Sequence, residues 1–201
     1  DDVIEKVMSV QGIKTVCKEV ETTLYFGDLD FIPGLHTSLA ELKKTDPESF
    51  EGEVYNPDVT AKGGRLLGYS RSELSDYFRT NSYELVEGRH LTEQDKDKIL
   101  ISDVLAKKNH LALGDTICGE QNKYLTELGD PSVIIYKKNF EIVGIFHVNV
   151  SQVISEYTLE EEIAENYMFA ACSTIQELRQ KDAQLQGINN GLLYDKASFF
   201  V

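Results

Sequence analysis

The chain contains 201 residues, of which 34 are Asp or Glu and 20 are Lys or Arg, so its formal net charge at pH 7 is −14. Hydrophobic residues make up 41% and charged residues 27%, a balance typical of folded globular proteins rather than of disordered or collagenous chains. Nucleic acids and anionic membrane surfaces are bound through clusters of Lys and Arg. The acidic composition therefore argues against nucleic acid and against such membrane surfaces as partners.

A helix followed by a long strand is predicted for the first part of the chain. Apolar residues recur at helical spacing over residues 2–10, which predicts a short helix. Gly12 is suited to end this helix, because glycine adopts the left-handed conformation at little cost. Residues 13–26 alternate loosely between polar residues and β-branched or aromatic ones, and this pattern predicts a strand.

The segment of residues 27–62 is the least regular part of the chain. Three proline-containing pairs interrupt it, namely Pro33-Gly34, Asp46-Pro47 and Asn56-Pro57. Leu35, Leu39 and Leu42 recur at helical spacing within it. We therefore expect one short helix inside an otherwise irregular segment.

From residue 63 onward, short strands alternate with short helices. Strands are expected at residues 63–69, 98–101, 132–136, 140–148, 168–171 and 191–201, and directly after the Gly114-Asp115 turn. Helices are expected at 72–78 and 102–109, capped by Ser72 and Ser102, at 158–163, and after a cap at Ser173. Residues 132–136 and 140–148 are predicted to pair as a hairpin across residues 137–139. Since regular βαβ repetition is absent, the predicted fold class is α+β with mixed sheets.

No catalytic constellation is recognisable in the sequence. The run from Gly68 to Ser72 approaches the G-x-S-x-G nucleophile motif, with Ser70 at the serine position, but it lacks the final glycine that the strained turn needs. We interpret it as a strand that leads into a helix. The four histidines, His36, His90, His110 and His147, show no metal-binding or catalytic spacing. No catalytic or cofactor-binding residue is therefore predicted, and we expect no enzyme activity.

No metal site is predicted either. Asp28-Leu29-Asp30 and the alternating acids at residues 93, 95 and 97 lack the glycine and the distal glutamate of an EF-hand loop, so we interpret them as solvated acidic turns. Cys17, Cys118 and Cys172 lie too far apart in sequence for a zinc motif. We interpret these cysteines as buried thiols, while the sequence leaves open whether two of them form a disulfide.

The sequence lacks the targeting and membrane-spanning patterns of an integral membrane protein. Its longest apolar runs have strand length, well short of the roughly 20 residues that cross a bilayer, and no signal peptide is recognisable. The chain starts at an acidic pair and stops within an expected strand. We expect it to be a piece of a longer protein.

An ordered set of motifs resembles a known family. The set is Glu84-Leu85-Val86-Glu87-Gly88-Arg89, then Asp95, Ile99-Leu100-Ile101-Ser102, Leu105-Ala106, Leu111-Ala112-Leu113-Gly114-Asp115-Thr116-Ile117 and Phe140-Glu141-Ile142-Val143-Gly144-Ile145. It resembles the signature of the MacB-like core domain, and Val10-Gln11-Gly12-Ile13 and Ala197-Ser198-Phe199-Phe200-Val201 are similar to its opening and closing strands. The glycines suit turns or close backbone approach, and the aliphatic residues suit buried strands. The signature is thus one of fold and not of catalysis.

The resemblance implies a porter-like βαβ subdomain with an inserted mixed α/β subdomain. The porter-like part would comprise residues 1–79 and 185–201, and the inserted part residues 80–184. Residues 27–62 depart from the family pattern as an irregular insertion. Aromatic residues in this insertion, Phe31, Phe50 and Tyr55, are candidates for contact with a partner if they are exposed.

The resemblance also implies a function, that of the extracytoplasmic domain of a bacterial ABC transporter permease of the MacB, FtsX and LolC/LolE type. Such a domain lies on the extracellular or periplasmic side of the cell membrane. It would transmit conformational change from a cytoplasmic ABC ATPase, next to a second permease protomer, and would bind a peptide, lipid or lipoprotein. No cofactor is implied.

Two other functions are compatible with the residues. The chain could be the extracellular sensor or ligand-binding domain of a signalling receptor, or an extracellular hydrolase that uses Ser70 or an acidic pair. The sequence leaves open the transported substrate, the surface that contacts a partner, and whether the permease is a homodimer or a heterodimer.

Overall fold

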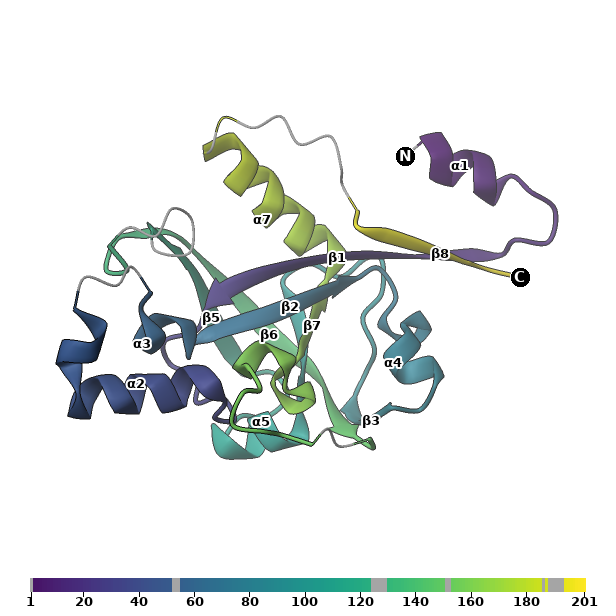
Figure 1. Cartoon of the computed structure of the whole chain (residues 1–201). Helices are drawn as coiled ribbons and strands as arrows, with labels where there is room; N and C mark the ends of the chain where they lie inside the picture. The colour runs from purple at the N-terminus through teal and green to yellow at the C-terminus, as the bar shows by residue number, and fades with distance from the viewer. Residues whose placement is uncertain (1, 52–54, 124–129, 151–152, 186, 188–193) are drawn as a thin grey trace.

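One mixed β-sheet organises the molecule. The computed structural model describes residues 2–51, 55–123, 130–150, 153–185, 187 and 194–201. Within these residues eight strands belong to a single sheet, and helices are arranged around it (Figure 1). Because helices and a mixed sheet are combined without regular βαβ repetition, the predicted α+β class is confirmed.

The elements follow one another in short segments. The helices are α1 (Asp2–Met8), α2 (Leu35–Thr45), α3 (Pro57–Thr60), α4 (Asp76–Arg79), α5 (Asp103–Lys108) and α7 (Cys172–Leu185). The 3₁₀ helices are η1 (Pro47–Phe50), η2 (Ser72–Leu74), η3 (Glu160–Glu162) and η4 (Ala164–Asn166). The strands are β1 (Thr15–Tyr25), β2 (Gly63–Tyr69), β3 (Tyr83–Gly88), β4 (Lys98–Ser102), β5 (Thr116–Asn122), β6 (Ile134–Val148), β7 (Met168–Ala171) and β8 (Lys196–Phe200).

Six of the strands close into a ring, in the order β1-β2-β7-β4-β6-β5 and back to β1. The pairs β2–β7 and β4–β6 are parallel, and the other pairs of the ring are antiparallel. β1 and β6 are the long strands, of 11 and 15 residues, and each has two partners along one edge. β8 and β5 share an edge of β1, whereas β5 and β3 share an edge of β6.

The central strands are buried on both faces. In β4, Ile99 and Ile101 belong to a core cluster with Phe140, whereas Leu100 belongs to a second cluster with Phe146. Successive side chains of a strand point to opposite faces, so a strand that is covered on both sides needs a continuous apolar run. This requirement explains the short apolar runs at β4 and β7.

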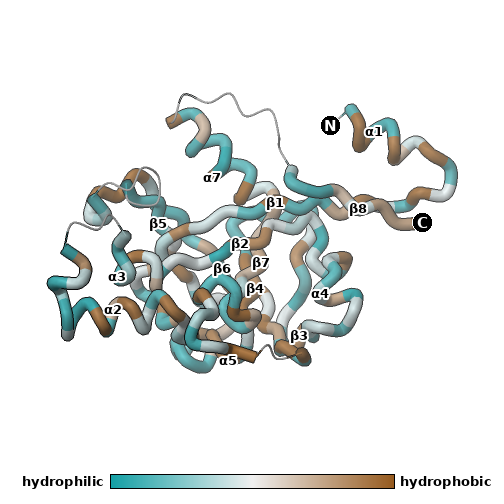
Figure 2. Tube along the Cα trace, viewed as in Figure 1, coloured by the Kyte–Doolittle hydropathy of each residue, from teal (hydrophilic) through white to brown (hydrophobic). Residues whose placement is uncertain are grey.

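Helices cover the sheet through apolar stripes. α7 packs on β1, β2 and β7 and buries Ile175 and Leu178, and α5 packs on β4 and β6 and buries Leu105. Figure 2 shows hydrophobic residues concentrated in the central strands and hydrophilic ones along most of α7. In the part of the chain that the structure describes, no helix combines the length and the apolar character needed to cross a membrane.

Most of the predicted elements are confirmed, including the helix in the irregular segment, which is α2. Ser102 accepts a hydrogen bond from Leu105 N at 3.0 Å and caps α5 as expected. Two other predicted caps are wrong. α4 is capped by Ser75 and not by Ser72, and Ser173 lies inside α7, where its hydroxyl donates to the carbonyl of Asp95. The helix predicted over residues 158–163 contains only the 3₁₀ turn η3.

The predicted hairpin across residues 137–139 is wrong. These residues lie in the middle of β6, and Asn139 is the partner of Cys118 in β5. Lys138 forms an ion pair with Asp97 at 2.6 Å. No glycine is present to give the positive φ of a tight hairpin turn, so the pairing with β5 continues through this polar stretch.

The predicted division into two subdomains stays a prediction. β1, β2 and β8 come from the expected porter-like segments, and β3 to β7 come from residues 80–184. These two sets of strands hydrogen bond to each other in one sheet, through β2–β7 and through the narrow β1–β5 contact.

Candidate functional site

The motifs of the family signature meet at one place on β6. Gly88 lies opposite Gly144, and the amide of Arg89 donates to the carbonyl of Val143 at 2.9 Å. Gly88 has a φ of +78°, and a Cβ atom there would lie 2.2 Å from the oxygen of Val143. Only glycine therefore allows β3 to approach β6 so closely.

The Gly114-Asp115 turn docks on the same stretch of β6. The amide of Gly114 donates to the carbonyl of Ile142 at 2.8 Å, and the amide of Ile142 donates to the carbonyl of Asp115 at 2.9 Å. The carboxylate of Asp115 accepts a hydrogen bond from the amide of Ala112 and so closes its own turn. Motifs that are separated by many residues in the sequence thus converge on residues 142–144.

Arg89 and Asp95, two charged residues of the signature, form a bidentate ion pair. Both guanidinium nitrogens donate to the carboxylate at 2.7 Å, and the amide and hydroxyl of Thr92 donate to it as well. The Asp95 side chain is only 8% exposed. The Arg89 hydrogen bonds are the main reason that the pKa of Asp95 falls to about 2.

Asp95→Asn is expected to lower the free energy of unfolding at pH 7 by about 1–2 kcal/mol, since half-exposed Arg89 is partly screened by solvent. A depressed carboxyl pKa adds stability above the unfolded value near 4, and this contribution is lost as the pH falls toward 2. Urea denaturation at pH 7 and at pH 2 measures this contribution to the free energy of unfolding. The difference in unfolding free energy between the wild type and Asp95→Asn should be much smaller at pH 2 than at pH 7. A difference that is unchanged at pH 2 would contradict the assignment.

A groove lies between α1 and the beginning of β1. It has a volume of about 560 Å³, and Ile4 and Met8 of α1 line one side of it. Apart from Val16, polar residues line the rest, including Lys18, Arg71 and Glu93. α1 itself buries no residue completely and extends beyond the body of the sheet (Figure 1).

The groove lies at the end of the molecule where the start of β1 lies beside the end of β8. The amide of Lys14 donates to the carbonyl of Phe200 at 2.8 Å, and Thr15 lies opposite Phe200 in the β1–β8 ladder. β1 and β8 are antiparallel, so the start of one strand lies next to the end of the other (Figure 1).

Both serines near the nucleophile-like motif are buried. Ser70 is 6% exposed, and its hydroxyl accepts a hydrogen bond from the amide of Lys18. Ser72 lies 3.0 Å from Nδ1 of His90, a serine–histidine contact that the sequence did not reveal. Ser72 is nevertheless fully buried and accepts the amide of Leu91. Its role is to join η2 to the chain beyond β3.

The acidic turns carry ion pairs rather than a recognisable calcium loop. Asp30 pairs with Lys62 at 3.0 Å, and Asp97 pairs with Lys138. The cysteines are free thiols, and Cys17 and Cys172 are buried as expected, whereas Cys118 is half-buried. Burial raises the pKa of Cys17 to about 11 and that of Cys172 to about 12, so both thiols stay protonated at neutral pH.

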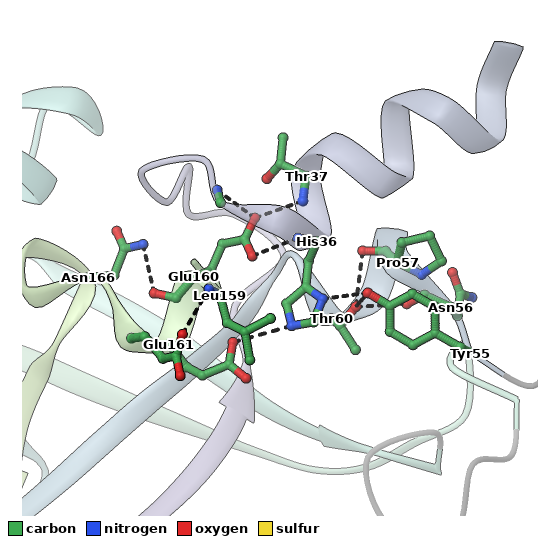
Figure 3. A network of polar contacts seen from close by, with 12 residues as sticks. His36, Thr37, Tyr55, Asn56, Pro57, Thr60, Leu159, Glu160, Glu161 and Asn166 are labelled. Carbon is green, nitrogen blue, oxygen red and sulfur yellow. Dashed lines mark hydrogen bonds and ion pairs between the residues drawn. The ribbon is translucent and has the colours of Figure 1, made fainter. Parts of the chain in front are cut away.

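A buried polar network joins the irregular segment to η3 (Figure 3). Glu160 is fully buried, and its carboxylate accepts the amides of Gly34, His36 and Thr37 at 2.7–3.0 Å. These amides belong to the first turn of α2, whose N-terminus has no capping side chain of its own, as its cap residue is glycine. Glu160 therefore caps α2 from a distant segment and places a negative charge at the positive end of the helix dipole.

The imidazole of His36 lies between two side chains of this network. Its Nδ1 contacts the hydroxyl of Tyr55, and its Nε2 lies 3.4 Å from Oε2 of Glu161 (Figure 3). The pKa of His36 is raised by Glu161, whose own pKa is lowered by His36. Asn166 adds two further hydrogen bonds to the backbone of Ile32. The sequence did not predict this cluster, because its members come from distant segments.

The three predicted contact residues differ in exposure. Phe31 is 6% exposed and packs edge to face against Phe26, so it lies in the core and not on the surface. Phe50 is half-buried at the end of η1, and Tyr55 is half-buried against His36. The proposed partner contact through these aromatic residues stays a prediction.

Comparison with known proteins finds similarity only at the level of structure. No family model matches the chain, and no curated protein matches it. The chain is similar to the extracellular domain of the noncanonic ABC-type transporter YknZ from Gram-positive bacteria, at 14% identity and a TM-score of 0.45, over 100% of this chain and 72% of that chain. It is also similar to the periplasmic region of MacB from Actinobacillus actinomycetemcomitans, at 12% identity and a TM-score of 0.42, over 98% of this chain and 75% of that chain. Both are domains of the kind that the sequence motifs resemble. The roles of individual residues are argued from the geometry of this chain alone.

Proposed function

We propose that the chain is the extracytoplasmic domain of an ABC transporter permease of the MacB-like type, and that it has no catalytic centre. The observation that carries this proposal is the convergence of the signature motifs on residues 142–144 of β6. Gly88 and Gly144 permit close approach there, and the Gly114-Asp115 turn docks beside them. The ordered resemblance in the sequence therefore corresponds to one physical unit and not to scattered coincidences.

The pairing of β1 with β8 supports the same function. The amide of Lys14 donates a hydrogen bond to the carbonyl of Phe200, so the chain enters β1 and leaves β8 at one place. This arrangement suits a domain inserted between two membrane-spanning segments on the extracellular or periplasmic side. The groove beside α1 lies at this end, and we propose that it takes part in relaying motion from a cytoplasmic ATPase.

We further propose the division into subdomains that the resemblance implies. Residues 1–79 and 185–201 would form a porter-like subdomain, and residues 80–184 would form an inserted mixed α/β subdomain. A peptide, a lipid or a lipoprotein is the proposed substrate, and a second permease protomer is the proposed neighbour. Burial of both Ser70 and Ser72 supports a domain that acts by binding and movement.

A deletion in the full-length permease tests this function. Residues 15–200 are replaced by a short Gly/Ser linker, which can join the flanks because Lys14 and Phe200 are adjacent. We expect the permease and its ATPase to assemble and to hydrolyse ATP at the basal rate, while transport and its stimulation by substrate are lost. ATP hydrolysis and export are measured in membranes.

The matched control is Lys44→Gln in the same permease, which removes one exposed ion pair with Glu41 outside the signature motifs and leaves the domain in place. It is expected to keep transport. Transport that persists after the deletion would contradict the proposed function. A full-length chain that carries a kinase module instead of membrane-spanning permease segments would favour the sensor domain.

A further inference from the structure

We propose that His36, Glu160 and Glu161 bind one divalent transition-metal ion, with a further coordination position open to solvent. One ligand atom from each residue lies within 4.8 Å of the other two. His36 belongs to α2, whereas the two glutamates belong to η3. An ion here would therefore link the irregular segment to a distant part of the chain.

The separation of His36 and Glu161 suits a shared metal ion. Nε2 and Oε2 lie 3.4 Å apart, which is longer than the 2.7–2.9 Å or so of a charged hydrogen bond. Two ligand atoms on a tetrahedral zinc ion, each about 2.0–2.1 Å from the metal, are roughly 3.3–3.5 Å apart. The observed distance therefore already matches one edge of a zinc coordination tetrahedron.

The histidine is held in the way that metal-binding histidines require. A ligating imidazole usually hydrogen bonds through its other nitrogen, and this bond fixes the ring and its tautomer. Nδ1 of His36 contacts the hydroxyl of Tyr55, which can accept a hydrogen bond from a protonated Nδ1. Nε2 then has a free lone pair, and it is the nitrogen that faces Glu161.

Glu160 supplies a fixed carboxylate with remaining capacity. Its Oε1 accepts the amides of Gly34 and Thr37, and its Oε2 accepts the amide of His36. A carboxylate has about four acceptor positions, so these three hydrogen bonds leave capacity for a metal ion. Three hydrogen bonds from backbone amides hold this side chain in place. A ligand whose side chain is already fixed loses little conformational entropy when it binds a metal ion.

Charge and access also favour a cation. Two carboxylates face one imidazole, and because a ligating imidazole is neutral, two negative charges remain for a divalent ion to balance. A cavity of about 400 Å³ adjoins Glu161 and is also lined by Thr23, Arg65 and Glu162. The Glu161 side chain is 38% exposed, so an ion can enter from this cavity and keep a water molecule as an additional ligand.

The test is a titration of the chelator-treated 201-residue chain with Zn²⁺ in the presence of excess Mg²⁺ and salt. Mg²⁺ occupies acidic surfaces but competes poorly for an imidazole. We expect one equivalent of Zn²⁺ to bind and to raise the melting temperature. In a parallel titration with Co²⁺, the absorption spectrum of the bound ion is expected to be that of a site with one nitrogen ligand.

Two variants assign the ligands. Glu161→Gln and His36→Gln are each expected to weaken Zn²⁺ binding at least about tenfold, because a three-ligand site loses a charged or an imidazole ligand. The matched controls are His147→Gln and Asp103→Asn. They remove an exposed histidine–carboxylate pair at 2.8 Å that is not part of the three-residue cluster, and they are expected to leave binding unchanged.

The outcomes separate clearly. A wild-type chain that binds no Zn²⁺ under these conditions would overturn the proposal, as would Glu161→Gln and His36→Gln variants that bind as tightly as the wild type. Circular dichroism checks that each variant is folded. Should His36→Gln fail to fold, Glu161→Gln decides the matter, since its side chain is partly exposed and keeps its size. None of these readouts depends on transport activity.

Discussion

Glu160→Ala is expected to lower the free energy of unfolding by about 3–5 kcal/mol. The substitution leaves the amides of Gly34, His36 and Thr37 without their acceptor in a buried place, and each unpaired donor costs about 1–3 kcal/mol before the structure relaxes. It also removes the negative charge from the N-terminus of α2. Urea denaturation in the presence of a chelator measures the loss without any contribution from bound metal.

Glu162→Ala is the matched control, two residues away in the same 3₁₀ turn. Its carboxylate accepts one hydrogen bond, from the exposed amide of Leu159 at 3.1 Å. We expect this variant to lose less than about 1 kcal/mol. If Glu160→Ala were no more destabilising than Glu162→Ala, water would have to replace the carboxylate, and the proposed capping of α2 from a distant segment would be wrong.

Gly88→Ala is expected to destabilise the protein by about 3–4 kcal/mol. The residue has a φ of +78°, which costs an alanine about 1–2 kcal/mol, and its Cβ atom would lie 2.2 Å from the carbonyl oxygen of Val143. That oxygen belongs to the central strand β6 and accepts the amide of Arg89, so neither partner can move away easily. The β3–β6 pairing has to open locally.

Gly114→Ala separates the two contributions. Its φ of +87° is equally unfavourable for alanine, but nothing lies within 4 Å of the added Cβ atom. It should therefore cost only about 1–2 kcal/mol. Thermal denaturation distinguishes the variants, because 1 kcal/mol corresponds to about 2–4 °C in a chain of this size. Equal melting temperatures for the two variants would show that the close approach at Gly88 is not as tight as described.

The elements that depend on local chemistry were predictable from the sequence. The run Lys98–Ser102 is short, apolar and followed by a serine that can cap a helix, and both β4 and α5 form there. The leucines after residue 34 gave α2 for the same reason. The sequence-based predictions failed where two neighbouring residues were equally suited to the same local role. Ser72 and Ser75 are both good caps, and only the burial of Ser72 against Leu91 decides between them.

Features that depend on long-range pairing were not predictable. Residues 137–139 are polar and suited to a turn, and only their pairing with Gly119 and Cys118 in β5 shows that the strand continues. The cluster of His36 with Glu160 and Glu161 brings together distant segments, and no spacing in the sequence indicates it. Arg89 and Asp95 are only six residues apart in the sequence. A threonine three residues before an aspartate, here Thr92 before Asp95, is a local signal for a turn, and it could have indicated that these residues lie close together.

The antiparallel pairing of β1 and β8 has a mechanical consequence. Tension applied through Lys14 and Phe200 acts at the same end of both strands, so it opens the five residue pairs of this ladder one after another instead of shearing them together. Sequential opening needs much less force than simultaneous rupture. The β1–β8 ladder therefore offers little resistance to such pulling. A compressive or sideways force would instead be carried by the closed ring of six strands.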